Sequence, residues 1–125
     1  MATPDDRRYS SSHEWHRVEG DLVAIGLTRY AVDALTDVTY VELKKAGTRV
    51  ASGDSVGEVE SVKTTSDVYS ALDGEIVAVN GALESSPGLL NEDPYEHWLV
   101  RIKPGDLGGL ADLMDAATYD RQHAG

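Results

Sequence analysis

The sequence contains no cysteine among its 125 residues. Side-chain disulfides, thiolate metal sites and a cysteine nucleophile are therefore excluded. Any sulfur redox chemistry in which the chain takes part has to arrive on a cofactor. A chain of this length is predicted to form one domain around a single hydrophobic core.

Basic residues are also scarce, with 11 Lys and Arg against 22 Asp and Glu and a formal net charge of -11. Because phosphate binding depends on clustered Lys and Arg, nucleic acid is not an expected partner. The acidity can serve solubility and keep the protein monomeric. It can equally speed the encounter with partner enzymes that carry basic patches. The sequence does not show how the acidity divides between solubility and docking.

Long apolar runs are missing as well. The longest, such as Leu22-Val23-Ala24-Ile25, are far shorter than a bilayer crossing requires, and no charged and then apolar leader follows Met1. We therefore expect a cytoplasmic monomer that is kept at full length and has no membrane partner.

The chain shows no clear metal-binding pattern. His13-Glu14-Trp15-His16 places two histidines three residues apart, which differs from the His-Glu-x-x-His zinc pattern, and no third ligand has suitable spacing. The expectation is a protein without a bound metal ion and without an active site of its own.

Short strands separated by Gly, Asp and Ser turns, with few helices, are typical of a β-sandwich or flattened barrel. Thr28 is a suitable N-cap for a short helix through Leu35. Leucines at 107, 110 and 113 predict a C-terminal helix over residues 106–115, weakened by Gly108-Gly109. Within the predicted strand 38–43, Val38 should face away from Val41. Strands are expected at 22–27, 38–43, 57–59, 68–71, 75–79 and 97–103.

Lys63 lies in the run Glu60-Ser61-Val62-Lys63-Thr64-Thr65-Ser66-Asp67, between two of these predicted strands. A lysine at the apex of a hairpin is held in water, where an enzyme can acylate it. An exposed turn lysine is usually only a solubilising charge, so the surrounding residues have to decide between the two interpretations.

The run resembles the modification site of the H protein of the glycine cleavage system, in which this lysine carries lipoic acid. The resemblance covers roughly Tyr9 to Tyr119 and consists of several blocks in the family's order. These blocks are Ser12-His13-Glu14-Trp15, Gly20-Asp21, Ile25-Gly26-Leu27-Thr28, Val41-Glu42-Leu43, Glu60-Ser61-Val62-Lys63, Ser66-Asp67-Val68-Tyr69-Ser70, Gly74-Glu75-Ile76-Val77 and Asn91-Glu92-Asp93-Pro94-Tyr95.

The resemblance implies a mainly β fold, the barrel-sandwich hybrid of lipoyl and biotinyl carriers, with a short helix near residues 28–35 and a C-terminal helix. It implies a carrier domain over residues 9–119, with flexible ends at 1–8 and 120–125. Biotin carriers typically have methionine on both sides of the lysine, whereas Val62 and Thr64 stand there in this chain.

The function that the resemblance implies is a non-catalytic shuttle for the aminomethyl group of glycine. Its partners would be the P protein (a pyridoxal-phosphate glycine decarboxylase), the T protein (an aminomethyltransferase) and the L protein (dihydrolipoamide dehydrogenase). A separate lipoylating enzyme would attach lipoic acid to Lys63, giving an arm on the order of 14 Å. An H-like lipoyl donor or regulatory lipoyl-bearing protein is the alternative.

The same resemblance suggests roles for further residues. Ser12, Glu14 and Asp67 would surround the ammonium of the aminomethyl cargo, because a partly dry carboxylate binds a cation more strongly than one in water. Glu60, Val62 and Asp67 would be read by the lipoylating enzyme. The simpler interpretations are a surface salt bridge for Glu14, a turn hydroxyl for Ser12 and a solvated strand edge for Glu60.

Three residues depart from the family pattern. Thr36 stands where glycine is usual after the first helix, so the turn there is expected to be shaped differently. Tyr40 replaces a common phenylalanine and needs a hydroxyl partner if it is buried. His97 precedes Trp98 where glycine is frequent. None of the three is close to Lys63 in sequence.

Overall fold

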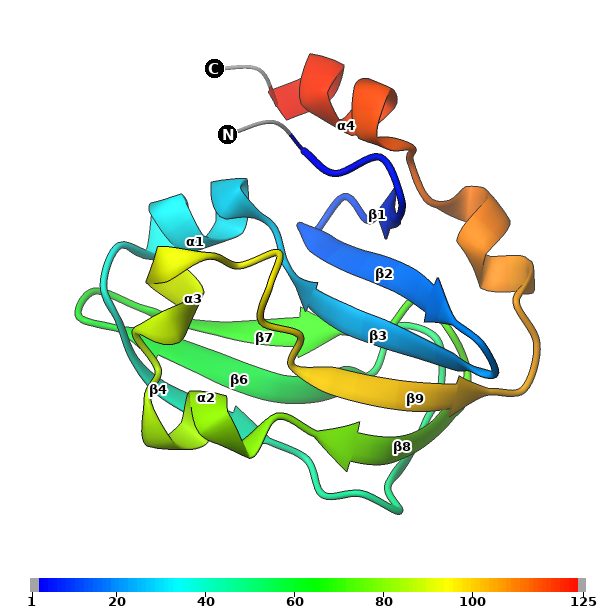
Figure 1. Cartoon of the computed structure of the whole chain (residues 1–125), viewed down its shortest axis with the longest axis horizontal. Coiled ribbons are helices and arrows are strands. Elements are labelled where there is room, and N and C mark those ends of the chain that lie inside the picture. The colour runs from blue at the N-terminus through cyan, green and yellow to red at the C-terminus, as the bar shows by residue number, and fades with distance from the viewer. Residues whose placement is uncertain (1–2, 124–125) are drawn as a thin grey trace.

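A computed structural model describes residues 3–123 and shows two open β-sheets with helices around them (Figure 1). The six-stranded sheet has the order β1–β2–β3–β9–β8–β5 and the three-stranded sheet the order β4–β6–β7. This confirms the expected mainly β fold. The strands are β1 (Arg8–Tyr9), β2 (Glu14–Glu19), β3 (Leu22–Leu27), β4 (Val38–Leu43), β5 (Arg49–Val50), β6 (Ser55–Ser61), β7 (Thr65–Tyr69), β8 (Gly74–Val79) and β9 (Val100–Pro104).

The main core lies between the two sheets. Ile25 of β3 and Ile102 of β9 face Val59 of β6 and Val68 of β7, and all four are fully buried. Neighbouring strands pair antiparallel, as short connections between them allow. The strand signals at 22–27, 38–43 and 75–79 are confirmed to within a residue.

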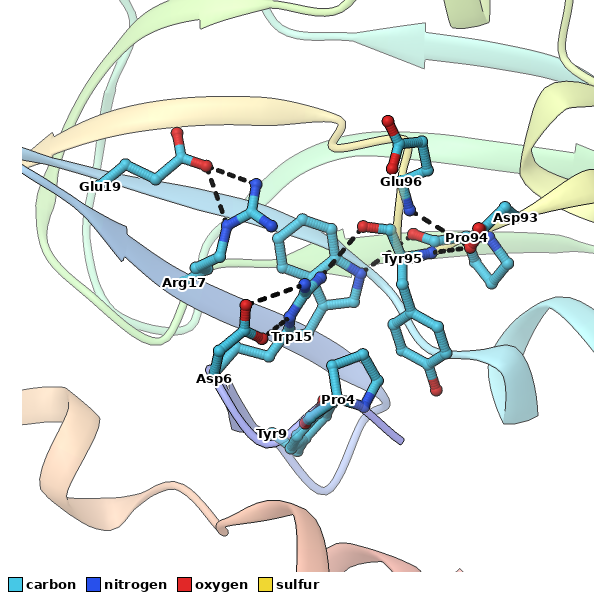
Figure 2. Close-up of polar contacts among 11 residues, drawn as sticks. Pro4, Asp6, Tyr9, Trp15, Arg17, Glu19, Asp93, Pro94, Tyr95 and Glu96 are labelled. Atoms are coloured by element: carbon cyan, nitrogen blue, oxygen red, sulfur yellow. Dashed lines mark hydrogen bonds and ion pairs between the residues drawn. The ribbon is translucent and has the colours of Figure 1, made fainter. Parts of the chain in front are cut away.

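A second apolar layer covers the other face of the six-stranded sheet. There Trp15 packs across Gly26, where a Cβ atom would come within 2.4 Å of the indole ring. The Trp15 Nε1–H donates to the Pro94 carbonyl at 3.1 Å (Figure 2). The Arg7 guanidinium lies 4.5 Å from the indole centroid. The sheet is therefore buried on both faces along β3.

The first helix, α1 (Arg29–Leu35), begins where the sequence predicts. Thr28 is its N-cap and accepts a hydrogen bond from the Ala31 N–H. After the helix, Thr36 adopts φ 66° and ψ -134°, a positive φ that is unusual for a β-branched residue. Thr36 is therefore held in a backbone conformation that favours glycine and is strained there, and the expected difference in the shape of this turn stays a prediction.

The C-terminal helix lies further along the chain than predicted. Residues 106–115 contain the 3-10 helix η1 (Gly108–Asp112), and the helix is α4 (Ala116–His123). Two contacts explain the shift: a side chain at Gly109 would come within 2.6 Å of the Ala71 carbonyl oxygen, and Met114 pairs with Tyr9 through two main-chain hydrogen bonds. Asp115, whose carboxylate accepts the Thr118 N–H, then caps the start of α4.

Other predicted features are correct only in part. The strand expected at 97–103 is β9, which begins at Val100. Val38 is buried with Val41, because a register shift between Val38 and Tyr40 rotates the first residue of β4. Tyr40 is 47 % exposed and donates to Glu42, so its hydroxyl is satisfied at the surface. Two short helices that the sequence did not indicate are α2 (Gly81–Ser85) and α3 (Leu89–Glu92).

The flexible ends expected at 1–8 and 120–125 stay a prediction. Within them the structure places Arg8 in β1 and residues 120–123 in α4, and β1 lies beside α4 (Figure 1). Residues 1–2 and 124–125 lie outside the described part of the chain.

Candidate functional site

Lys63 lies at the tip of the hairpin formed by β6 and β7, in the turn Ser61–Thr64, which we call the Lys63 turn. The Ser61 N–H donates to the Thr64 carbonyl at 2.8 Å, and the Ser61 hydroxyl accepts the N–H groups of Lys63 and Thr64 at 3.2 Å each. The side chains of Val62 and Lys63 are exposed. The predicted hairpin lysine is thus accessible to a modifying enzyme.

A groove of about 230 Å³ begins next to the Lys63 turn, between α1 and the start of β7. Figure 1 shows the loop joining β6 and β7 below α1. The groove, called the α1 groove below, has one wall from the helix and one from the hairpin. It is lined by Ser12, His13, Leu27, Ala31, Ala34, Leu35, Thr64, Thr65 and Ser66.

A second hollow, of about 370 Å³, surrounds the carboxylate of Glu14 and is called the Glu14 hollow. Ser12 lines both this hollow and the α1 groove, so the two adjoin. No basic side chain contributes to the part of its wall that the structure describes. The hollow is lined by Ser10, Ser12, Glu14, Ser52, Gly53, Tyr69, Ser70 and Ala71.

The Glu14 side chain is only 1 % exposed and accepts several hydrogen bonds. The hydroxyls of Ser10 and Ser12 donate to Oε1, and the Tyr69 N–H donates to Oε2 at 3.1 Å. Burial raises the pKa of Glu14, against the opposing effect of these donors. The surface salt bridge considered for Glu14 is therefore wrong, and the carboxylate is a buried group held by neutral donors.

Asp67 does not join Ser12 and Glu14. Its carboxylate lies on the outward face of β7, 3.4 Å from the Ser55 hydroxyl and 3.5 Å from the Tyr69 hydroxyl. Glu60 lies on the neighbouring strand β6, paired with Tyr40 and Thr65. The residues suggested for recognition are thus close to the Lys63 turn, and Asp67 meets the hollow only indirectly, through Tyr69.

Two donors to the Glu14 carboxylate were missed from the sequence. Ser10 is one, although its hydroxyl lies four residues before Glu14 and such local contacts are common in turns. The Tyr69 main chain is the other, and no side-chain pattern marks a backbone donor. His16, which lies beside them, is 1 % exposed, and its burial lowers its pKa to about 4.

The C-terminal helix supports the far wall of the α1 groove. The Tyr119 hydroxyl lies 2.8 Å from Nδ1 of His13 and 2.8 Å from the hydroxyl of Thr28, the N-cap of α1. The ring of His13 is also 4.5 Å from that of Tyr30. A helix that is distant in sequence therefore helps to set the position of α1.

Features of other kinds of site are limited. Residues 53–57 have the Gly-x-Ser-x-Gly spacing, but Ser55 lies in strand β6, donates to the Gly57 carbonyl and has no histidine partner among the described residues. Within residues 3–123 no three His, Asp or Glu side chains are placed to share a metal ion. None of the helices described is long and apolar enough to span a membrane.

Comparison with known proteins gives one consistent match. A family model described as Glycine cleavage H-protein matches residues 7–124. The glycine cleavage system H protein of Thermus thermophilus is 54 % identical over 120 residues, covering 95 % of this chain and 94 % of that protein. The H protein of Bordetella pertussis is 45 % identical over 119 residues, covering 95 % and 96 %. A crystal structure of a glycine cleavage system H protein from Mycobacterium marinum superposes with a TM-score of 0.89 at 39 % identity, covering 98 % of this chain and 99 % of that one.

Proposed function

This chain belongs to the glycine cleavage H-protein family, and from that premise we propose that it is the lipoyl-carrying shuttle of the glycine cleavage system. It moves the aminomethyl group of glycine between enzymes on an arm attached to Lys63. The observation that carries this proposal is the exposed position of Lys63 at the tip of a tight turn, one residue from the α1 groove. Nothing in the fold favours the alternative of a lipoyl donor or regulatory binding protein.

The residues present fit a lipoyl group on Lys63. A primary amine offers the attachment point, and a groove with apolar walls adjoins a carboxylate that lacks a basic neighbour among its described contacts. When bound, lipoic acid supplies the disulfide that takes up the aminomethyl group, which a chain without cysteine cannot supply itself.

The chain's own residues would shelter the arm. Leu27, Ala31 and Leu35 present apolar surface along the α1 groove, next to Thr64 at the base of the arm. Burying the aliphatic part of an arm against such surface contributes about 25 cal/mol per Å². The groove therefore favours a parked arm while leaving it free to leave for a partner enzyme.

Glu14 would bind the ammonium of the cargo. A buried carboxylate without a counter-ion gains more from a cation than an exposed one does, because its surroundings screen the attraction less. Ser12 lies at the junction of groove and hollow and donates to the same carboxylate. By holding the ammonium away from bulk water, these residues would slow hydrolysis of the cargo.

Asp67, Glu60 and Val62 are proposed as contacts of the lipoylating enzyme. Val62 is 72 % exposed beside Lys63, and both acids lie on neighbouring strands of the same hairpin. The role of Asp67 in the aminomethyl cleft remains a proposal that Tyr69 supports, since Tyr69 contacts both Asp67 and Glu14.

The proposed partners are the P, T and L proteins and the lipoylating enzyme. The chain itself would catalyse none of their steps, since its part is to present and protect the arm. We further propose that it works as a monomer in the cytoplasm, where a net charge of -11 aids encounter with basic docking patches.

The test is the intact mass of the protein after incubation with lipoate, ATP and a lipoate ligase. Wild type and Lys103→Arg, which alters another exposed lysine, should gain one lipoyl-sized increment, and Lys63→Arg should gain none. An increment on Lys63→Arg, or none on wild type while the ligase loads a known lipoyl domain, would overturn the proposal.

A further inference from the structure

Two side chains of β2 meet the end of β7 in a regular pattern. Glu14 and His16 lie two positions apart and so face the same side of the strand. Glu14 Oε2 accepts the Tyr69 N–H at 3.1 Å, and His16 Nε2 accepts the Ala71 N–H at 3.1 Å. Donors two residues apart are therefore matched to acceptors two residues apart.

These contacts replace a strand partner. β7 is an edge strand of the three-stranded sheet, whereas β2 belongs to the six-stranded sheet. The intervening Ser70 N–H donates to the Asp54 carbonyl. The main chain of residues 69–71 is thus fixed at each N–H, and β2 side chains supply two of the three acceptors.

The hydrogen bond from Ala71 assigns the state of the His16 ring. An amide N–H can only donate, so Nε2 offers its lone pair and a neutral ring carries its proton on Nδ1. His16 Nδ1 is buried and has no hydrogen-bond partner among the described residues. An unpaired buried donor is unfavourable, so the orientation of the His16 ring carries a free-energy cost. The hydrogen bond that Nε2 accepts from the Ala71 N–H offsets this cost.

His16 stands next to the wall of the Glu14 hollow. Ser70 and Ala71 line that hollow together with Tyr69, and the Ala71 carbonyl accepts the Ser52 hydroxyl at 3.0 Å. A displacement of Ala71 would carry with it both this wall and the Tyr69 N–H that donates to Glu14.

We propose that His16 is a positioning residue for the cargo site: by accepting the Ala71 N–H it holds the end of β7 where Tyr69 can donate to Glu14. This proposal rests on the proposed function for its biological meaning, but not for its geometry. Glu14 binds the cation, and His16 acts on it only through the main chain of residues 69–71.

The geometry can be tested by NMR on the unmodified protein. In wild type, amide exchange at Ala71 should be slow, and the Tyr69 amide shift should follow the titration of Glu14. In His16→Leu the Ala71 amide should exchange roughly 10-fold to 100-fold faster, since loss of its acceptor lowers local protection. The Tyr69 shift should also lose much of its response to Glu14.

Conservative variants separate this role from simple packing. A glutamine carbonyl can reach as far as Nε2, so His16→Gln should keep both signals near wild type, whereas the shorter His16→Asn should lose them. His97→Leu is the matched control, because His97 is not one of the residues that line the hollow. The NMR signals of the core residues Val23 and Ile102 report whether His16→Leu folds. If it does not fold, the comparison of His16→Gln with His16→Asn provides the test.

Cargo lifetime then links the geometry to function. With lipoylated and aminomethyl-loaded protein, His16→Asn should release its cargo about tenfold faster than wild type, as expected for a weakened charged hydrogen bond, and His16→Gln should not. Equal Ala71 exchange in the Gln and Asn variants would overturn the positioning role. A wild type that takes up no lipoate would instead overturn the proposed function while leaving the NMR comparison valid.

Discussion

The Lys63 turn and the Glu14 hollow lie next to the same groove but are built in opposite ways. The hydrogen bonds that close the turn join residues within Ser61–Thr64. The Glu14 carboxylate instead receives donors that lie two, four and 55 residues away in sequence. The proposed attachment point is therefore a local structure, whereas the proposed cargo site exists only when both sheets have assembled.

The two regions also differ in their electrostatics. Lys63 is exposed to water and forms no ion pair among residues 3–123. Glu14 has lost water and gained three neutral donors, so its charge is more costly and more able to attract a cation. Changes near the turn should thus alter modification, and changes near the hollow should alter stability and cargo binding.

Acid should act most strongly on the hollow, through the protonation of His16. The folded state holds the pKa of His16 at about 4, below its value of 6.5 in an unfolded chain. Between these values the unfolded state binds more protons, so stability is lost as pH falls, by roughly 3 kcal/mol in total at about 1.4 kcal/mol per unit. Urea denaturation at pH 7, 5.5 and 4 measures this loss.

The His16→Gln variant is the reference for that experiment, because glutamine does not titrate. Its stability should fall less than that of wild type over the same interval. If the free energy of unfolding falls equally with pH in the two proteins, the assignment of a neutral buried ring to His16 is contradicted.

The next largest effect separates stability from cargo binding at Glu14. Glu14→Gln can still accept the Tyr69 N–H but carries no charge, so cargo should be released about tenfold faster. Since the raised pKa of Glu14 means that ionisation destabilises the fold as pH rises, the variant should be at least as stable as wild type at neutral pH. Glu58→Gln, an exposed acid on β6, is the control. A loaded arm equally long-lived in both variants would count against the ammonium site.

A smaller effect is expected at Thr36, on the strained end of α1. Thr36→Gly relieves a positive φ in a β-branched residue and should stabilise the protein by about 1 kcal/mol. Thr118→Gly, inside α4, should instead destabilise the protein, because glycine is a poor helix former. Thermal unfolding of the two variants checks the comparison, and a Thr36→Gly variant less stable than wild type would show that this turn is not strained.

The smallest effect tests the Lys63 turn. Ser61→Ala removes the acceptor for the N–H groups of Lys63 and Thr64 and should cost about 0.5 kcal/mol, because both groups can turn to water. Ligase kinetics should show slower lipoylation, with the cargo lifetime of the loaded protein unchanged. Ser85→Ala in α2 is the control, as Ser85 is exposed and lies outside the groove and the hollow. A change in cargo lifetime would break the separation between turn and hollow.

The accuracy of the sequence predictions follows the same division. The N-cap at Thr28 and the hairpin around Lys63 depend on residues a few positions apart, and both were predicted correctly. The C-terminal helix was misplaced because Gly109 packs against Ala71 and Met114 pairs with Tyr9. The leucine spacing in 106–115 carries no information about either contact.

The class of fold, the exposed hairpin that carries Lys63, and the turns and caps that form within a few residues could all be inferred from the amino-acid order. The burial of the Glu14 carboxylate, the hydrogen bond from Ala71 to His16 and the outward position of Asp67 became visible only in the folded chain. The physical reason is that a local hydrogen bond needs little chain ordering, whereas burial and pKa depend on segments brought together from across the chain.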